Sequence, residues 1–308
     1  MGTPGFAVLP LRALATAGHD LCGVVTRTDK PAGRGRTLSE PAVKIAAREL
    51  GLTVFQPKRV RDPDFIATLR ALRPEAIVVA AYGQILPKEI LSLPRHGCIN
   101  IHASLLPLYR GAAPINWALI RGERETGNTI MLMDEGMDTG AILLQESIPI
   151  GLKDTAGTLT DKLSERGGRL ITKALGLIET GGLPGVPQNN EKATLAPLLK
   201  KADGLIDWSM TAIEIHNRVR GLSPWPGAYG FLDNTMIKLL ETEVVEGSGE
   251  PGLLYEKDRN DLEAAAGRGM LRILSLQPEG KKSMTAAEFL RGHRGLSGKK
   301  FEARIPKS

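Results

Sequence analysis

Cysteine is scarce in this chain, since only Cys22 and Cys98 occur among its 308 residues. Each lies in its own apolar, strand-like run. This excludes a disulfide framework, indicates a reducing compartment and predicts that both thiols are buried in the core. The chain also lacks a secretory signal sequence and an apolar run long enough to cross a membrane. We therefore expect a soluble, cytoplasmic protein.

Aromatic residues are also few, at 4% of the chain, and acidic residues are outnumbered, with 34 Asp and Glu against 40 Lys and Arg. The net charge of +6 and the pI near 9.3 make a polyanionic partner plausible. The basic excess is concentrated, because residues 27–44 hold five basic side chains against two acidic ones and residues 281–308 hold eight against two. The alternative is that both stretches are solvated faces that only keep the protein soluble.

The first part of the chain alternates between apolar strand patterns and amphipathic helix patterns. Strands are expected at residues 21–26, 53–55, 76–81 and 98–101, and helices at residues 41–50, 63–73, 113–121 and 154–178. This alternation predicts an α/β fold with a doubly wound, mostly parallel sheet. Residues 27–40 form a long, basic, Gly- and Pro-containing loop in this scheme, and loops of that length are usually functional or disordered.

A second, smaller domain follows a stretch of linker composition. The expected boundaries are 1–182 for the first domain, 183–202 for the linker and 203–308 for the second domain. A helix at 209–221 is followed by short strands near residues 229, 237, 252, 262 and 271. Five short strands predict a small β-barrel that resembles the oligonucleotide-binding (OB) fold.

The chemistry is concentrated between residues 97 and 140. Asn100 and His102 alternate along a short buried strand, so both side chains point to one side, about 6.5 to 7 Å apart. Asp138 lies on a turn rich in Gly and Asp. An amide that stabilises an oxyanion, an imidazole that exchanges a proton and a carboxylate that orients the imidazole are the groups that acyl transfer requires. The alternative is a core histidine with two ordinary turn residues.

Two other kinds of site are not supported. His96, Cys98 and His102 share one side of the same strand, and ligands in one row point in one direction instead of converging on a metal ion. Gly2-x-x-Gly5 lacks the third glycine and the downstream acid of a dinucleotide-binding motif. We therefore expect neither a metal nor a nicotinamide cofactor.

The residue types of the central stretch are more specific than the spacing of Asn100, His102 and Asp138. The motif runs Asn100-Ile101-His102-x-Ser104-Leu105-Leu106-Pro107-x-x-Arg110-Gly111-x-x-Pro114, then Met133-Asp134-x-Gly136-x-Asp138-Thr139-Gly140. This pattern resembles the folate-dependent formyltransferases. Residues 109–115 and the basic stretch 30–36 resemble, in particular, the members that act on methionyl-tRNA.

The resemblance implies formyl transfer from the co-substrate 10-formyltetrahydrofolate to the amino group of initiator methionyl-tRNA, without a metal, by a catalytic domain and an OB-like tRNA-binding domain. It implies that Asn100, His102 and Asp138 are catalytic. The folate-binding residues it implies are Ser104, Leu105, Leu106, Pro107, Tyr82, Gly83, Ile85 and Leu86. The tRNA contacts it implies are Lys30, Arg34 and Arg36. We expect a monomer. The alternatives are a formyltransferase that acts on a small amine, such as glycinamide ribonucleotide or an amino sugar nucleotide, and a non-catalytic RNA-binding protein.

One expectation concerns the start of the chain. In the family, a turn like Gly2-Thr3-Pro4-Gly5 follows the first strand of the sheet, whereas this sequence begins at the turn. A first strand in a doubly wound sheet is central and apolar on both faces. We therefore expect that about five apolar residues upstream of Met1 belong to the native protein, and that the chain without them is only marginally stable.

Overall fold

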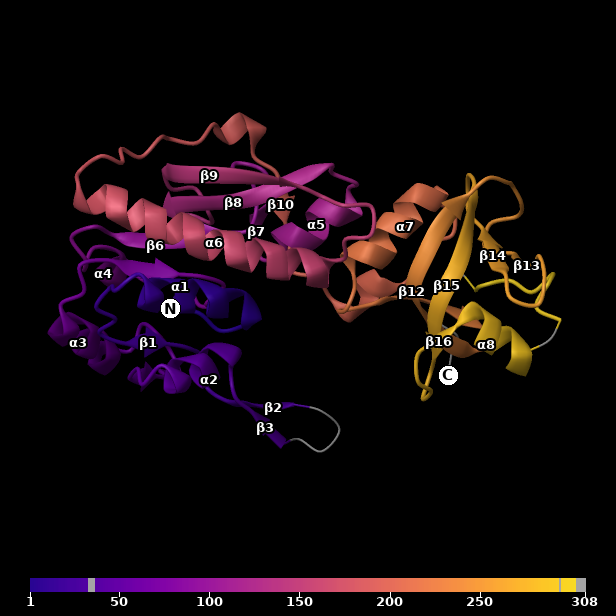
Figure 1. Ribbon diagram of the computed structural model, residues 1–308, viewed down its shortest axis with the longest axis horizontal. Helices are drawn as coiled ribbons and strands as arrows, with labels where there is room; N and C mark the ends of the chain where they lie inside the picture. The colour runs from indigo at the N-terminus through magenta and orange to yellow at the C-terminus, as the bar shows by residue number, and fades with distance from the viewer. Residues whose placement is uncertain (33–36, 294, 303–308) are drawn as a thin grey trace. The chain divides into compact units, whose positions relative to one another are not determined.

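The fold is that of a computed structural model, which describes residues 1–32, 37–293 and 295–302 (Figure 1). These residues form two compact units. The first unit contains residues 1–114, 125–149 and 160–196, and the second contains residues 115–124, 150–159 and the chain from 197 onward. Within the described ranges, no helix combines the length and the apolar character needed to cross a bilayer.

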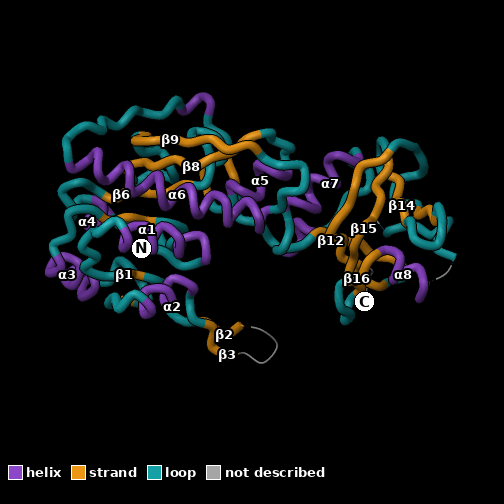
Figure 2. Tube along the Cα trace, in the orientation of Figure 1, coloured by secondary structure: helices purple, strands orange, loops and turns teal. Residues whose placement is uncertain are grey.

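Among its described residues, the first unit contains ten short or medium strands, and strands are orange in Figure 2. They are β1 (Val24–Val25), β2 (Lys30–Ala32), β3 (Thr37–Ser39), β4 (Val54–Phe55), β5 (Ile77–Val79), β6 (Cys98–His102), β7 (Arg110–Gly111), β8 (Glu125–Leu132), β9 (Ile142–Pro149) and β10 (Leu195–Ala196). β5 and β6 pair in parallel, as do β1 and β4, while β8 and β9 extend the sheet antiparallel in the order β5-β6-β8-β9. The predicted α/β fold class is confirmed, and the antiparallel β8–β9 hairpin forms one edge of the sheet.

Helices connect these strands. They are α1 (Val8–Thr16), α2 (Ala42–Glu49), α3 (Pro63–Leu72), α4 (Lys88–Leu91), α5 (Pro114–Ile120) and α6 (Ala156–Glu179). α3 starts with proline at its first turn, where the missing N–H is not needed. α6 buries Leu163, Ile171 and Ala174 completely, and their spacing places them on one helical face. A Cβ at Gly167 would lie 2.9 Å from Cγ2 of Ile101 on β6, so glycine lets α6 pack closely against this strand.

Met1 and Gly2 lie between β1 and β5. The N–H of Gly2 donates to the carbonyl of Val25 at 3.0 Å, and the N–H of Ala80 donates to the carbonyl of Met1 at 2.9 Å. The amino group of Met1 donates to the carbonyl of Val78. These two residues therefore act as a very short strand that links β1 to β5. Burial lowers the pKa of the Met1 amino group to about 6.

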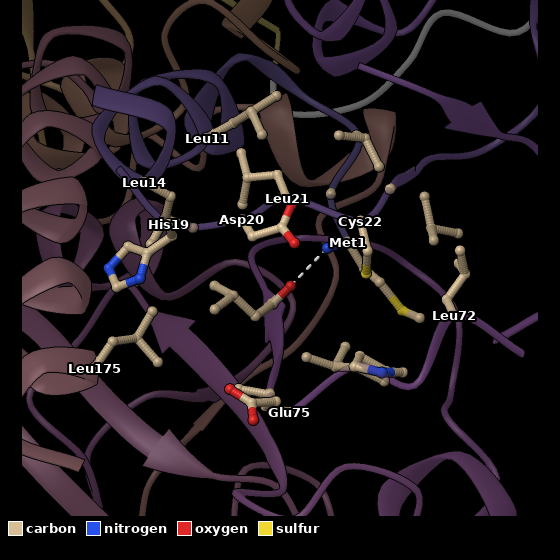
Figure 3. A pocket seen from close by; sticks show the side chains of 18 of the residues that line it. Met1, Leu11, Leu14, His19, Asp20, Leu21, Cys22, Leu72, Glu75 and Leu175 are labelled. Atoms are coloured by element: carbon tan, nitrogen blue, oxygen red, sulfur yellow. Dashed lines mark hydrogen bonds between the residues drawn. The ribbon is translucent and has the colours of Figure 1, made fainter. Parts of the chain in front are cut away.

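A cavity of about 370 Å³ opens beside Met1 between β1 and β5 (Figure 3). Leu14 of α1, Leu72 of α3 and Leu175 of α6 line it, together with backbone of both strands. Its lining includes none of Asn100, His102 and Asp138, so this cavity is separate from the candidate active site.

From residue 197 onward, the described part of the second unit contains a six-stranded antiparallel sheet and two capped helices. Its elements are α7 (Ala212–Gly221), β11 (Ala228–Leu232), β12 (Thr235–Val245), β13 (Leu254–Glu256), β14 (Leu262–Ala265), β15 (Met270–Pro278), β16 (Met284–Thr285) and α8 (Ala286–Gly292). The strand order is β11-β12-β15-β14-β13, with β16 paired to β15. The five predicted strands are present. β16 and α8 were not predicted.

Local sequence explains the boundaries in this unit. Thr211 and Glu214 form a reciprocal capping box at the start of α7, and Thr285 and Glu288 form another at the start of α8. Asp233 and Asn234 form the two-residue turn between β11 and β12, and their φ values are 47° and 61°. Two left-handed residues are what a tight hairpin of this length requires.

Two sequence-based expectations were wrong in detail, and one further segment contains a strand that the sequence did not predict. The loop expected at 27–40 contains the antiparallel pair β2–β3, with Lys30 opposite Ser39, because the two ends of the loop pair through their backbones. Cys22 is exposed, whereas Cys98 is buried as expected, because the strand β1 is shorter than predicted and begins only at Val24. Residues 183–202, expected as a linker, include β10, which pairs in parallel with β7.

Candidate active site

Asn100 and His102 lie on β6, the strand at the centre of the sheet β5-β6-β8-β9. β6 is buried along its whole length, with β5 on one edge and β8 on the other. Asn100 is 9% exposed and His102 is 5% exposed. Because the side chains of a strand alternate, both residues point to the same face of the sheet.

Asp138 lies over this face, on the loop between β8 and β9. Its Oδ1 accepts a long hydrogen bond from Nδ2 of Asn100 at 3.4 Å, and its Oδ2 lies 3.6 Å from Nδ1 of His102. The N–H of Gly111 also donates to Oδ2, at 2.8 Å. The three residues singled out in the sequence therefore meet, and a backbone N–H holds the carboxylate in place.

The second nitrogen of the imidazole faces a carbonyl. Nε2 of His102 lies 2.9 Å from the backbone oxygen of Tyr109. Both ring nitrogens therefore face oxygen atoms, Tyr109 O on one side and the Asp138 carboxylate on the other. An imidazole placed between two such oxygens is suited to proton transfer.

The loop that follows β6 is built by internal hydrogen bonds. Oγ of Ser104 donates to the carbonyl of Leu108 at 2.6 Å, and the hydroxyl of Thr129 donates to the carbonyl of Ser104 at 2.6 Å. Nε2 of Gln145 donates to the carbonyl of Leu106 at 2.7 Å. Ser104 and Leu106 are buried, and their contacts shape the loop. Leu105 and Pro107 are partly exposed and are available to a ligand.

The turn after β5 lies at the same edge of the sheet, because β5 and β6 are parallel and both loops follow carboxyl ends. Tyr82 is 2% exposed, and burial raises its pKa to about 12. Leu86 is also buried, at 5% exposed, whereas Ile85 is 91% exposed. Gly83 has a φ of 80°, and its carbonyl accepts from Nη1 of Arg27 at 3.2 Å. Ile85 therefore offers apolar surface to solvent in this turn.

Comparison with known proteins identifies the family. Residues 1–175 match the family model described as formyl transferase, and residues 198–294 match the model of the formyl transferase C-terminal domain. The chain belongs to the formyltransferase family.

The relatives of this formyltransferase include curated proteins of nearly equal length. The chain is 52% identical to the methionyl-tRNA formyltransferase of Thermodesulfovibrio yellowstonii, covering 95% of this chain and 94% of that one. It is 48% identical to the methionyl-tRNA formyltransferase of Citrifermentans bemidjiense, covering 97% and 96%. Among solved structures, an N-formyltransferase from Helicobacter canadensis in complex with folinic acid and dTDP-3-aminofucose shares the fold, with a TM-score of 0.64, 19% identity and coverage of 88% and 96%.

Three basic residues of the formyltransferase were singled out for RNA contacts, and the structure describes one of them. Lys30 begins β2 and is exposed. Arg34 and Arg36 lie outside the described residues. The acids at the base of the hairpin are engaged by Lys44, whose Nζ contacts Asp29 at 2.6 Å and Glu40 at 2.9 Å.

Several groups at the site were not found from the sequence. The carbonyl of Tyr109 and the N–H of Gly111 are backbone groups, which any residue supplies, so no side-chain pattern marks them. Thr129 and Gln145 lie on β8 and β9, where they read as ordinary strand residues. In the part of the chain that the structure describes, no three His, Cys, Asp or Glu side chains are grouped to hold a metal ion.

Proposed function

We propose that this formyltransferase transfers the formyl group of 10-formyltetrahydrofolate to the free amino group of initiator methionyl-tRNA. The observation that carries the reaction is the meeting of Asn100, His102 and Asp138 on one face of β6. The choice of acceptor rests on the near full-length similarity to curated methionyl-tRNA formyltransferases. The basic stretches 27–44 and 281–308 support it, because a small acceptor needs neither.

Asn100 and His102 stabilise the tetrahedral intermediate in this proposal. The amino nitrogen of the acceptor attacks the formyl carbon, a new carbon–nitrogen bond forms, and negative charge develops on the formyl oxygen. An amide N–H and an imidazolium N–H are donors for that charge, and they act strongly here because both side chains are almost fully buried.

His102 and Asp138 then move the protons. The bond between the formyl carbon and N10 of the folate breaks, and His102 gives N10 the proton it needs to leave. The attacking nitrogen loses a proton, which Asp138 accepts through water. The products are formylmethionyl-tRNA and tetrahydrofolate, so atoms and charges balance.

The folate-binding side is assigned to the loops after β5 and β6. Ile85, Leu105 and Pro107 offer exposed or partly exposed apolar surface to the ring system. Tyr82, Leu86, Ser104 and Leu106 are buried and hold the two loops in shape, and the backbone at Gly83 completes the turn. Lys30, Arg34 and Arg36 are assigned to the tRNA phosphates and bases.

The direct test compares acceptors. The purified chain is supplied with 10-formyltetrahydrofolate and with one of four acceptors: charged initiator tRNA, charged elongator methionyl-tRNA, glycinamide ribonucleotide or an amino sugar nucleotide. We expect rapid formylation of charged initiator tRNA, measured as formylmethionine released from it. The other three acceptors should be formylated much more slowly. Faster formylation of either small amine would replace the proposal with that acceptor. Binding of tRNA without any turnover would instead indicate a non-catalytic RNA-binding protein.

A further inference from the structure

The loop that carries Asp138 contains a strained backbone position. Asp138 has a φ of 55°, in the left-handed region that costs free energy for a residue with a Cβ. Such a conformation persists only when neighbouring groups impose it. The partners of this loop are therefore of interest as parts of the catalytic machinery.

Gln188 contacts this loop from a distant part of the sequence. Its Nε2 donates to the carbonyl of Asp138 at 2.8 Å and to the carbonyl of Gly140 at 2.8 Å. An amide has two N–H groups, and both are used here. Gln188 is partly buried, whereas residues 184–187 and 189–192 are exposed. Gln188 is thus the one residue of 184–192 that is not classed as exposed.

Arg110 fixes the orientation of the Gln188 amide. Nε and Nη2 of Arg110 donate to Oε1 of Gln188 at 3.1 and 2.7 Å, and Nη2 also donates to Oδ1 of Asn190 at 2.8 Å. A flipped amide would place its NH₂ against the guanidinium and its oxygen against two carbonyls. Arg110 is 6% exposed, so its charge needs these acceptors.

The contacts close a ring around the carboxylate. Gln188 holds the backbone of Asp138 and also the guanidinium of Arg110, and the next residue, Gly111, donates its N–H to the Asp138 carboxylate. The preceding residue, Tyr109, presents its carbonyl to His102 and its N–H to Oγ1 of Thr194, at 2.8 Å. The segment 188–196 therefore holds both partners of the imidazole.

We propose that Gln188 is a positioning residue for formyl transfer, which sets the distance between the Asp138 carboxylate and His102. The inference rests on the proposed function, because it needs Asp138 to act through His102. Gln188 does not contact the reacting atoms in this assignment. It acts through the Asp138 backbone and through Arg110.

Three variants test this assignment: Gln188→Ala, Gln188→Glu and the control Glu191→Gln, an exposed position in the same segment. Gln188→Ala should lower kcat about 10- to 100-fold, as small misplacements of catalytic groups do, while KM for tRNA and for folate changes less than about threefold. Gln188→Glu keeps an acceptor for Arg110 but opposes two carbonyls with a carboxylate. The ion pair with the buried Arg110 guanidinium offsets this repulsion in the Tm, whereas the lost contacts with the Asp138 loop lower kcat, a split that a merely structural role would not produce. Glu191→Gln should match wild type.

A double variant tests the route. If Gln188 acts through Asp138, the substitution Gln188→Ala should cost almost nothing further in an Asp138→Ala background. An equal loss in both backgrounds, or wild-type kcat in Gln188→Ala and Gln188→Glu, would overturn the proposal. Absence of turnover in the wild-type chain itself would instead refute the proposed function, so the two failures are distinguishable.

Discussion

Nε2 of His102 lies 2.9 Å from the backbone carbonyl oxygen of Tyr109, seven residues later in the chain. This contact turns the other ring nitrogen toward Asp138, at 3.6 Å. The carbonyl and the carboxylate together fix the ring plane and offer two acceptors for its protons. The catalytic proposal depends on this arrangement, and the first prediction tests it.

Asn100, His102 and Asp138 should behave as one unit. Replacing any one of them by Ala should lower kcat/KM on the order of 10²-fold or more, as loss of an oxyanion donor or a general acid commonly does. Double variants should lose much less than the product of the single losses, because each residue needs the others. Steady-state kinetics with charged initiator tRNA measures this. Near wild-type activity in His102→Ala would contradict the assignment.

Arg36 should contribute to tRNA affinity and not to chemistry. Arg36→Ala should raise KM for tRNA and reduce the slope of log affinity against log salt by about one unit, because one phosphate contact releases about one counterion. Arg70→Ala, at an exposed position on α3, is the matched charge control and should leave both quantities unchanged. An unchanged slope together with a large loss of folate affinity would place Arg36 on the folate side.

Ile85 should affect folate binding and leave folding stability unchanged. The side chain is 91% exposed, so its removal loses little burial in the free protein. If it covers the folate ring, Ile85→Ser should raise the folate KM about tenfold, the equivalent of about 1.4 kcal/mol of lost apolar contact. The Tm should stay the same. Leu86→Ser at the buried neighbour is the contrast, because it should lower the Tm. A wild-type folate KM in Ile85→Ser would remove Ile85 from the binding site.

The buried amino group of Met1 should make stability depend on pH. Burial lowers its pKa from 8.0 to about 6, so between these values the unfolded chain binds more protons than the folded chain. The free energy of unfolding should therefore rise by about 2 to 3 kcal/mol as pH increases from about 6 to 8. Below pH 6 this amino group should add no further pH dependence, because it is protonated in both states. Denaturant unfolding of the chain beginning at Met1 across this range measures it.

The control for this prediction extends the chain. About five apolar, β-branched residues placed before Met1 should lie between β1 and β5, fill the cavity beside Met1 and replace the buried ammonium by a neutral amide. This extension should raise the Tm and remove the pH dependence. An extension of equal length made of Gly and Ser should not raise the Tm. If both extended chains have the same Tm as the chain that begins at Met1, the added apolar residues do not fill this cavity.

Much of the fold follows from local patterns. The helix predicted at 63–73 is α3 at Pro63–Leu72, and the strand predicted at 98–101 is β6 at Cys98–His102. Proline at a first turn and an uninterrupted apolar run act within a few residues, so the sequence shows them directly. Asn100 and His102 point to the same face of the sheet because side chains alternate along a strand with a period of two. The β2–β3 hairpin was missed because Gly and Pro composition indicates a turn but not the pairing of its two ends.

The sequence by itself thus determined several of the elements, α3 and β6 among them, and which amide and imidazole share one face of β6. Only the tertiary structure decided what surrounds them. Gly111 donates to Asp138 across 27 residues of sequence, and Gln188 reaches the Asp138 carbonyl across 50. Each contact involves a backbone N–H or C=O group. Every residue except proline has both groups, so the residue type at that position does not predict the contact. They form because strand pairing and the packing of the segment 188–196 bring residues that are far apart in the sequence close together in space. This proximity depends on the fold of the whole unit, and no local sequence pattern encodes it.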